Sequence, residues 1–336
     1  MTTTTLRAPM PYFGGKASAA PLIWSAFGDV RHYIEPFCGS AAVLLAAATP
    51  PPIVTLNDKD GYLVNAYRAI QAAPDAVAQW AAWPVTEIDL FARHVWLVQR
   101  RETLRAMLEA DPLAYDAQAA GWWLWGASSW IGSGWCSGDG PWWLNDGTLV
   151  RRDAGRGVNR QLPHLGNTGR GVNRQLPNLS ARAGGDGKHA TAAGGLAAYM
   201  RRLSAALATA RIACGDWSRV VTPSLLRQGV TGVLLDPPYG DGAMEYGAGG
   251  NADTTIAAAV WQWAVTHGGD RALRIVVCGY DDGRALPPGW TTQRWQPPSG
   301  YRNQAGERRR ADEVLWCSPH CHVAQPDLFD ALEVTR

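Results

Sequence analysis

The sequence lacks any apolar run close to the roughly 18 residues that a membrane-spanning helix needs. Its first residues, Met1-Thr2-Thr3-Thr4-Thr5, also lack the basic and apolar regions of a secretory signal. The net charge is only +2, so the overall charge balance points to no particular partner. These absences predict a protein of the cytoplasm, in a bacterial cell or an infected host cell, without membrane contact.

Cysteine is scarce as well, with six residues scattered along the chain. Cys38, Cys214 and Cys278 lie in or beside apolar runs, which indicates reduced, buried thiols rather than a disulfide framework. The segment from Cys317 to His322 is denser in soft metal ligands. It lacks a matching second pair of ligands elsewhere in the chain, so a zinc site is the less favoured interpretation and we predict no bound metal.

A short apolar, β-branched run at residues 230–235 is typical of a buried parallel strand. Asp236-Pro237-Pro238-Tyr239 follows it directly. Asp236 is therefore expected at the carboxyl end of the strand, where open α/β sheets bind their ligands. The chain has 336 residues and 46% hydrophobic content, which suffices for one large domain or two ordinary ones.

The two prolines make this turn rigid and leave it with hydrogen-bond acceptors only. The Asp236 carboxylate and the Pro237 carbonyl can each accept a hydrogen from an exocyclic amine on a flat ring, while Tyr239 stacks on the ring face. Both bonds would stabilise positive charge as such an amine attacks an electrophilic methyl group. The plainer alternative is a turn that merely ends a strand.

The N-terminal half carries three further motifs. Tyr12-Phe13-Gly14-Gly15-Lys16 combines a flexible glycine pair with a cation, and it fits either an anion contact or a simple turn. Glu35-Pro36-Phe37-Cys38-Gly39 joins a predicted strand to an alanine-rich predicted helix, as expected where a cofactor crosses a strand-to-helix turn. The next predicted strand, residues 53–56, ends in Asn57-Asp58, and an acidic residue there is expected to bind ribose hydroxyls.

These motifs, in this order, resemble those of the Dam-like DNA adenine methyltransferases over roughly residues 9–70 and 212–320. The resemblance implies S-adenosylmethionine as the methyl donor and adenine in DNA as the acceptor. One departure is Ala41, which stands where the family usually has a second glycine in the first loop. The resemblance assigns cofactor contacts to Tyr12, Gly14, Gly15, Lys16, Glu35, Phe37, Gly39, Asp58, Asp216 and Asp236, and catalytic roles to Asp236, Pro237, Pro238 and Tyr239.

The resemblance also implies the fold, an α/β Rossmann-like methyltransferase with a mixed sheet of about seven strands. Residues 313–316 are predicted to belong to the pair of strands that closes this sheet, which then has one antiparallel edge. Residues 1–84 and 205–336 would form the cofactor-binding catalytic domain. Residues 85–204 would form an inserted helical and basic-loop region that recognises the DNA target.

The inserted region opens with an amphipathic helix predicted at residues 87–110 and ended by Asp111-Pro112. A tryptophan-rich stretch follows, in which Trp122, Trp123 and Trp125 are predicted to belong to the core. The glycine-rich segment after it resembles a DNA-proximal loop of the family. Trp130 or Trp135 is therefore predicted to contact the base stack or the displaced base.

An internal repeat at residues 155–165 recurs at residues 169–179. Between Arg151 and Lys188 there are eight basic and two acidic residues, an excess of six in a chain whose total is +2. Such a local excess indicates a nucleic-acid surface that reads bases, contacts only phosphates, or is a plain surface loop. The predicted DNA contacts are Arg156, Asn159, Arg160, Gln161, Arg170, Asn173, Arg174 and Gln175.

The predicted activity is site-specific methyl transfer to the exocyclic amine of an adenine flipped out of double-stranded DNA. No obligate protein partner is predicted. Three alternatives remain open at this point. The acceptor could be the N4 amine of cytosine or adenine in RNA, or the chain could be a DNA-binding module with a degenerate cofactor site.

Overall fold

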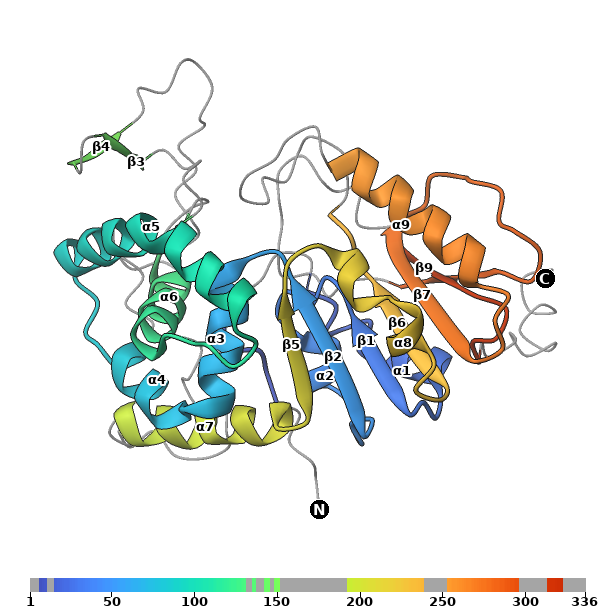
Figure 1. Cartoon of the computed structure of the whole chain (residues 1–336), viewed down its shortest axis with the longest axis horizontal. Helices are drawn as coiled ribbons and strands as arrows, with labels where there is room; N and C mark the ends of the chain where they lie inside the picture. The colour runs from blue at the N-terminus through green and yellow to red at the C-terminus, as the bar shows by residue number, and fades with distance from the viewer. Residues whose placement is uncertain are drawn as a thin grey trace, which may run out of the picture.

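The computed structural model describes residues 6–10, 15–130, 135–136, 142–145, 148–151, 192–238, 253–295 and 313–322. It has the mixed α/β architecture that the sequence predicts (Figure 1). Its centre is a seven-stranded sheet of strand order β5-β2-β1-β6-β7-β9-β8. The strands are β1 (His32–Glu35), β2 (Ile53–Asp58), β5 (Ala210–Cys214), β6 (Thr231–Leu235), β7 (Leu273–Tyr280), β8 (Thr291–Arg294) and β9 (Glu313–Cys317).

The five strands from β5 to β7 pair in parallel, and β9 pairs antiparallel with both β7 and β8. The predicted mixed sheet and the predicted strand at residues 313–316 are thus confirmed. The predicted closing pair with one antiparallel edge is confirmed as well, since β9 and the edge strand β8 form this pair and run antiparallel.

Successive residues of the central strands enter two different cores, as the alternation of side chains along a strand requires. Leu234 packs with helices on one face, in a core cluster that includes Ile23 and Leu44. Val233 and Leu235 pack on the other face. All residues of β1 and β6 are buried, which confirms the predicted buried parallel strand ending before Asp236. The first face carries α1 (Ala20–Phe27) and α2 (Ala42–Leu45), and the second carries η1 (Trp217–Val220), α8 (Pro223–Leu226) and α9 (Asp253–His267).

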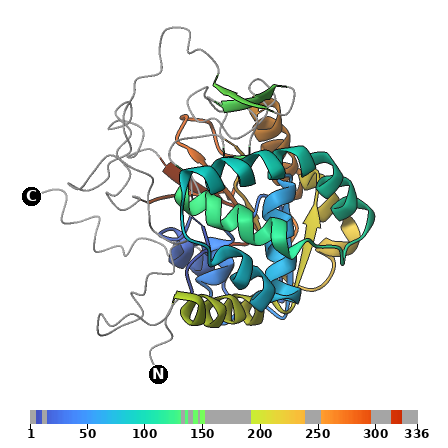
Figure 2. The ribbon, with the colours of Figure 1, turned by 90° about the vertical axis from the view of Figure 1, so that its left-hand side faces the viewer.

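A group of helices lies beside the β5 edge of the sheet and extends the first core (Figures 1 and 2). Its members pack on one another, α6 against both α3 and α4, and α7 against α3 and α4. Trp123 and Trp125 of α6 are buried in this core, and the half-buried Trp122 packs against it, as predicted. The helices are α3 (Gly61–Ala72), α4 (Pro74–Ala81), α5 (Glu87–Ala110), α6 (Ala117–Ser129) and α7 (Ala192–Leu207).

The predicted helix at residues 87–110 is α5. Its start is fixed by Thr86, whose hydroxyl accepts a hydrogen bond from the Asp89 amide at 3.1 Å. Asp111 caps its other end. The buried guanidinium of Arg68 donates to the carbonyls of Leu108 and Ile212, at 3.0 and 2.9 Å, and so joins the end of α5 to β5. This internal cation ties the helical group to the sheet.

A separate antiparallel pair, β3 (Trp142–Asn145) and β4 (Thr148–Arg151), lies apart from the main sheet (Figure 1). It falls inside the region predicted to recognise DNA, and the sequence analysis did not predict it. None of the helices in the described ranges is long and apolar enough to cross a membrane.

Candidate active site

The acidic residues singled out in the sequence gather at one edge of the sheet. Strands β2, β1 and β6 are parallel neighbours, so their carboxyl ends lie side by side. Glu35 and Asp58 are the last residues of β1 and β2, and Asp236 follows the last residue of β6. The sheet therefore brings three carboxyl groups, from positions up to 201 residues apart, to a common edge.

Lys16 forms an ion pair with Asp236, with 3.2 Å between Nζ and Oδ2. The lysine side chain is only 4% exposed, whereas the aspartate side chain is 20% exposed. Burial by itself lowers the pKa of Lys16, but the neighbouring carboxylates, Asp236 foremost, outweigh it and hold that pKa above its ordinary value. The glycine-lysine motif and the Asp-Pro-Pro turn thus belong to one site.

Glu35 lies almost wholly out of water, at 4% exposure. Burial raises the pKa of its carboxyl well above the usual value, the nearby Tyr33 hydroxyl lowers that pKa in part, and the charges of Asp236 and Asp58 raise it further. Its Oε2 has no hydrogen-bond partner among the described residues. A buried carboxyl oxygen without a donor is unfavourable, so this position fits a ligand that brings a hydrogen-bond donor such as an ammonium group.

Asp58 shapes the loop that follows β1. Its Oδ2 accepts from the Gly39 amide at 3.0 Å, and its Oδ1 accepts from the Asp60 amide at 2.9 Å. The residue is half-buried, and desolvation raises its pKa to about 6. Each carboxylate oxygen retains a second lone pair, so Asp58 can still accept from a hydroxyl group.

The loop itself is held by residues that the sequence analysis did not single out. Asn57 donates from Nδ2 to the carbonyls of Pro36 and Gly215, at 2.9 and 3.1 Å. The Tyr67 hydroxyl donates to the Gly39 carbonyl at 3.0 Å. The sequence around Asn57 does not indicate this role, because the two loops that its side chain joins lie far apart in the chain.

The loop also accounts for the unusual Ala41, which takes a left-handed conformation with φ of 50°. Gly39 has φ of 42°. Ala41 therefore keeps the left-handed backbone conformation that a glycine adopts freely. For a residue with a β-carbon this conformation costs about 1–2 kcal/mol. Replacing glycine by alanine here changes the strain in the loop and leaves its turn in place.

An aromatic pair borders the same edge. The rings of Phe37 and Trp217 are stacked, with centroids 6.2 Å apart and planes inclined by 27°. Asp216 caps η1 by accepting from the Ser218 amide at 2.9 Å, and hydrogen bonds from Ser218 lower its pKa. Flat rings beside a hydrogen-bond acceptor have the chemistry that suits a purine ring.

Trp130 and Trp135 lie together at the end of α6 but pack on protein groups. Trp130 stacks on His94 with centroids 4.9 Å apart, and Trp135 donates from its ring nitrogen to the Trp123 carbonyl at 3.0 Å. Burial lowers the pKa of His94 to about 4, so its ring is neutral near pH 7 and accepts from the Cys136 amide. The DNA contact predicted for both tryptophans stays a prediction.

Of the turn itself, Pro237 is buried and Pro238 is half-buried, and Gly15 is exposed beside Lys16. The other predicted residues lie outside the described ranges, and their roles stay predictions. They are Tyr12, Gly14, Tyr239, Arg156, Asn159, Arg160, Gln161, Arg170, Asn173, Arg174 and Gln175.

Comparison with known proteins bears on residues 12–83, which match the family described as D12 class N6 adenine-specific DNA methyltransferase. This segment runs from the glycine-lysine motif through β1, the loop, β2 and α3 to the end of α4. No curated protein matches the chain. The matched segment contains Lys16, Glu35 and Asp58, three of the residues gathered at the carboxyl edge of the sheet. The match and the seven-stranded α/β fold together support the resemblance of this chain to the Dam-like, D12 class N6 adenine-specific DNA methyltransferases, enzymes that methylate adenine in DNA.

Proposed function

We propose that the chain transfers a methyl group from S-adenosylmethionine to the exocyclic amine of an adenine flipped out of double-stranded DNA. The observation that carries this proposal is the ion pair between Lys16 and Asp236, 3.2 Å apart, beside the ends of β1 and β2. It links the turn proposed to hold the base with the segment that matches the methyltransferase family.

The residues of the edge fit this cofactor. The unpartnered Oε2 of Glu35 can accept from the ammonium of its methionine part, and Asp58 can accept from its ribose hydroxyls. Phe37 and Gly39 would lie in the loop beside the methionine part, and Asp216 would contact the adenine ring. Tyr12, Gly14, Gly15 and Lys16 would complete the site from the N-terminal side. The cofactor would supply an electrophilic methyl group bound to a sulfonium.

On the substrate side, Asp236 and the Pro237 carbonyl would accept the two hydrogens of the adenine amine, and Tyr239 would stack on the base. Both acceptors stabilise the positive charge that develops on the nitrogen. Lys16 holds the Asp236 carboxylate in place, and Pro237 with Pro238 keeps the turn rigid. Once methylated, the amine is acidic, so its proton can leave through Asp236 or water without a strong base.

Recognition of DNA is assigned to residues 85–204, inserted between the two parts of the catalytic domain, residues 1–84 and 205–336. The hairpin β3–β4 and the basic repeat lie in this region. The excess of six positive charges between Arg151 and Lys188 supports phosphate contacts with double-stranded DNA. The target base must leave the helix because its amine cannot reach a sulfonium methyl from inside the base stack.

Asp236→Ala tests the proposal directly. We expect the transfer of labelled methyl groups from S-adenosylmethionine to DNA to fall at least about a hundredfold, since the charge developing on the amine loses its partner. DNA association should change little. Asp29→Ala is a matched control, because Asp29 is exposed in the loop before β1, at the opposite edge of the sheet. An Asp236→Ala protein that keeps most of the activity would show that the turn does not hold the amine.

A further inference from the structure

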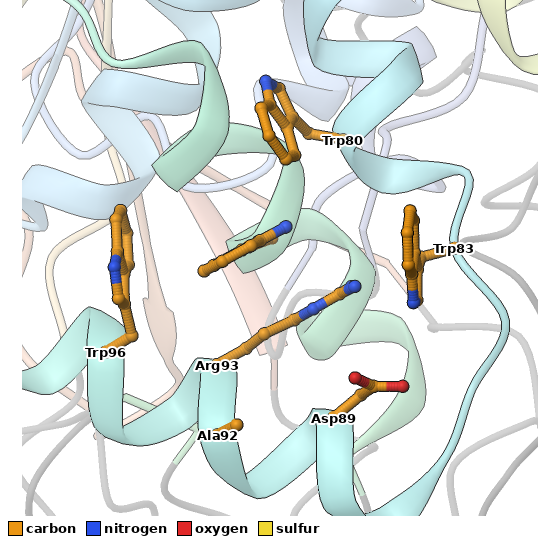
Figure 3. Close-up of a pocket in the computed structure, with 7 residues that line it drawn as sticks. Trp80, Trp83, Asp89, Ala92, Arg93 and Trp96 are labelled. Atoms are coloured by element: carbon orange, nitrogen blue, oxygen red, sulfur yellow. The ribbon is translucent and has the colours of Figure 1, made fainter.

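An open cavity of about 300 Å³ lies in the helical group, between α4, α5 and α6. Its lining includes four indole rings, those of Trp80, Trp83, Trp96 and Trp122. Figure 3 shows Arg93 extending from α5 into the space near Trp83, with Asp89 beside it. A cavity walled by tryptophan and entered by a buried cation suits a flat ring better than an alkyl chain.

Arg93 is the unusual member of this lining. It is only 5% exposed, and its guanidinium carbon lies over the rings of Trp83, Trp122 and Trp125, at 5.3, 5.0 and 4.2 Å. The π faces of these rings attract the cation, but they do not replace hydrogen-bond acceptors for its N–H groups. Its Nη1 has none in the described part of the chain. A buried charged donor without an acceptor is costly, which indicates that a ligand supplies one.

Trp122 provides a second donor of the same kind. Its Nε1 is buried and has no acceptor in the described part of the chain either. Asp89, one helical turn before Arg93, adds negative charge, and its Oδ2 accepts from the Thr86 hydroxyl at 2.6 Å. An anionic ligand would be repelled by Asp89. The lining therefore favours a neutral ring that presents acceptors to the two donors and can donate to Asp89.

Nucleobases are neutral flat rings with this distribution of polar atoms. We propose that the cavity binds one unpaired nucleobase, with guanine as the best fit. Guanine offers O6 and N7 as neighbouring acceptors, the pair that arginine recognises, and its N–H groups can face the carboxylate. Stacking on indole rings supplies affinity for any base. The outer wall, Trp83, is 49% exposed, so the base can enter from solvent.

The base can come from a free nucleoside or from a single strand, and the two sources separate in one titration. The probes are guanosine, the single strands TTGTT and TTATT, and a blunt duplex. Nuclear magnetic resonance of the full chain reports on the indole N–H of Trp122, which gains an acceptor on binding. Guanosine and TTGTT should shift this signal and TTATT should shift it less, while the duplex, whose bases are paired, should leave it unchanged. Tighter binding of TTGTT than of guanosine would identify a strand as the source.

Trp83→Ala should weaken the binding of guanosine and TTGTT about tenfold, the effect of losing one stacking partner. The fold should survive, since Trp125 donates to the backbone carbonyl of residue 83, at 2.8 Å, and not to its side chain. Arg93→Lys keeps the positive charge but removes the planar guanidinium and its paired N–H donors, so it should also weaken the binding of guanosine and TTGTT. Tyr115→Ala removes an aromatic ring that is 39% exposed outside the cavity and should have no effect.

Three results would overturn the proposal. The first is the absence of any shift of the Trp122 signal with guanosine or TTGTT at millimolar concentration. The second is equal affinity in the parent and Trp83→Ala proteins. The third is a shift produced by an aromatic peptide and by neither nucleobase probe, which would assign the cavity to a protein partner.

Discussion

Asp236→Asn should destabilise the protein more than Lys16→Met does, although each change removes the same ion pair. The asymmetry follows from burial, because Lys16 is 4% exposed and Asp236 is 20% exposed. Losing the aspartate removes the carboxylate paired with a buried ammonium. Losing the lysine leaves a carboxylate that water still reaches.

The magnitudes follow from the geometry. Two unit charges separated by 3.2 Å attract each other by about 5 kcal/mol at an effective dielectric constant of about 20. Desolvation of the lysine offsets part of this attraction. Breaking a buried ion pair by removing one partner costs about 3–5 kcal/mol, which we expect for Asp236→Asn. Lys16→Met should cost about 1–2 kcal/mol, because the remaining carboxylate is partly hydrated.

The dependence of stability on pH tests whether the burial of Lys16 causes the larger loss in Asp236→Asn. In the parent protein the pKa of Lys16 lies above its ordinary value of 10.5, so its contribution to stability is present below about pH 10.5 and is lost at higher pH. In Asp236→Asn, burial is expected to bring this pKa below the unfolded value. The free energy of unfolding of the variant should then rise between pH 7 and pH 10, where the lysine contribution in the parent is constant.

Urea unfolding followed by tryptophan fluorescence at several pH values measures these differences. Asp75→Asn is the control, since Asp75 pairs with Arg201 at 2.8 Å but both side chains are more than 60% exposed. It should change the free energy of unfolding by less than about 1 kcal/mol. Equal losses in the two active-site variants, or parallel pH profiles for Asp236→Asn and the parent, would refute the reasoning.

Two further predictions concern Asp58, which shapes the loop after β1, and the helical group. Because the pKa of Asp58 is raised to about 6, the affinity for S-adenosylmethionine should fall as the pH drops through that value, and calorimetric titration from pH 8 to pH 5 would test the ribose contact. A flat profile would argue against it. Gly121→Ala should destabilise by about 1–3 kcal/mol, since the new β-carbon would lie 2.4 Å from that of Trp80. Gly195→Ala in α7, where nothing lies within 4 Å, should instead stabilise by about 0.5–1 kcal/mol, and urea unfolding compares the two.

Local sequence patterns were sufficient to predict single strands and helices such as β6 and α5. The apolar run at residues 230–235 became β6 because a strand with a neighbour on each side and helices on both faces has no polar side. The predicted end of α5 followed from Asp111-Pro112, and the structure adds Thr86 as the cap of its start. The hairpin β3–β4 was missed although Asp146-Gly147, a common hairpin turn pair, separates its strands.

Local sequence patterns could not predict contacts between residues far apart in the chain. Nothing near Lys16 indicates that it meets Asp236, 220 positions away, because the pairing follows from the strand order. The alanine-rich segment after Gly39 was predicted as a helix, and α2 is only four residues long. A left-handed Ala41 precedes it, and Pro50, Pro51 and Pro52 follow before β2, so the chain has little room for another turn.

The packing of the helices at the β5 edge limits which parts of the chain can be exchanged with a relative to alter the choice of DNA target. Leu97 and Leu104 of α5 and Trp125 of α6 belong to the same continuous core as Ile23 of α1 and Leu44 of α2. A chimera that exchanged the whole of residues 85–204 with a relative would cut through this core and expose apolar surface on both sides of the junction. Grafts that aim to change the DNA sequence proposed to be recognised should therefore keep α5, α6 and α7. They should exchange only the segment between Trp130 and Ala192.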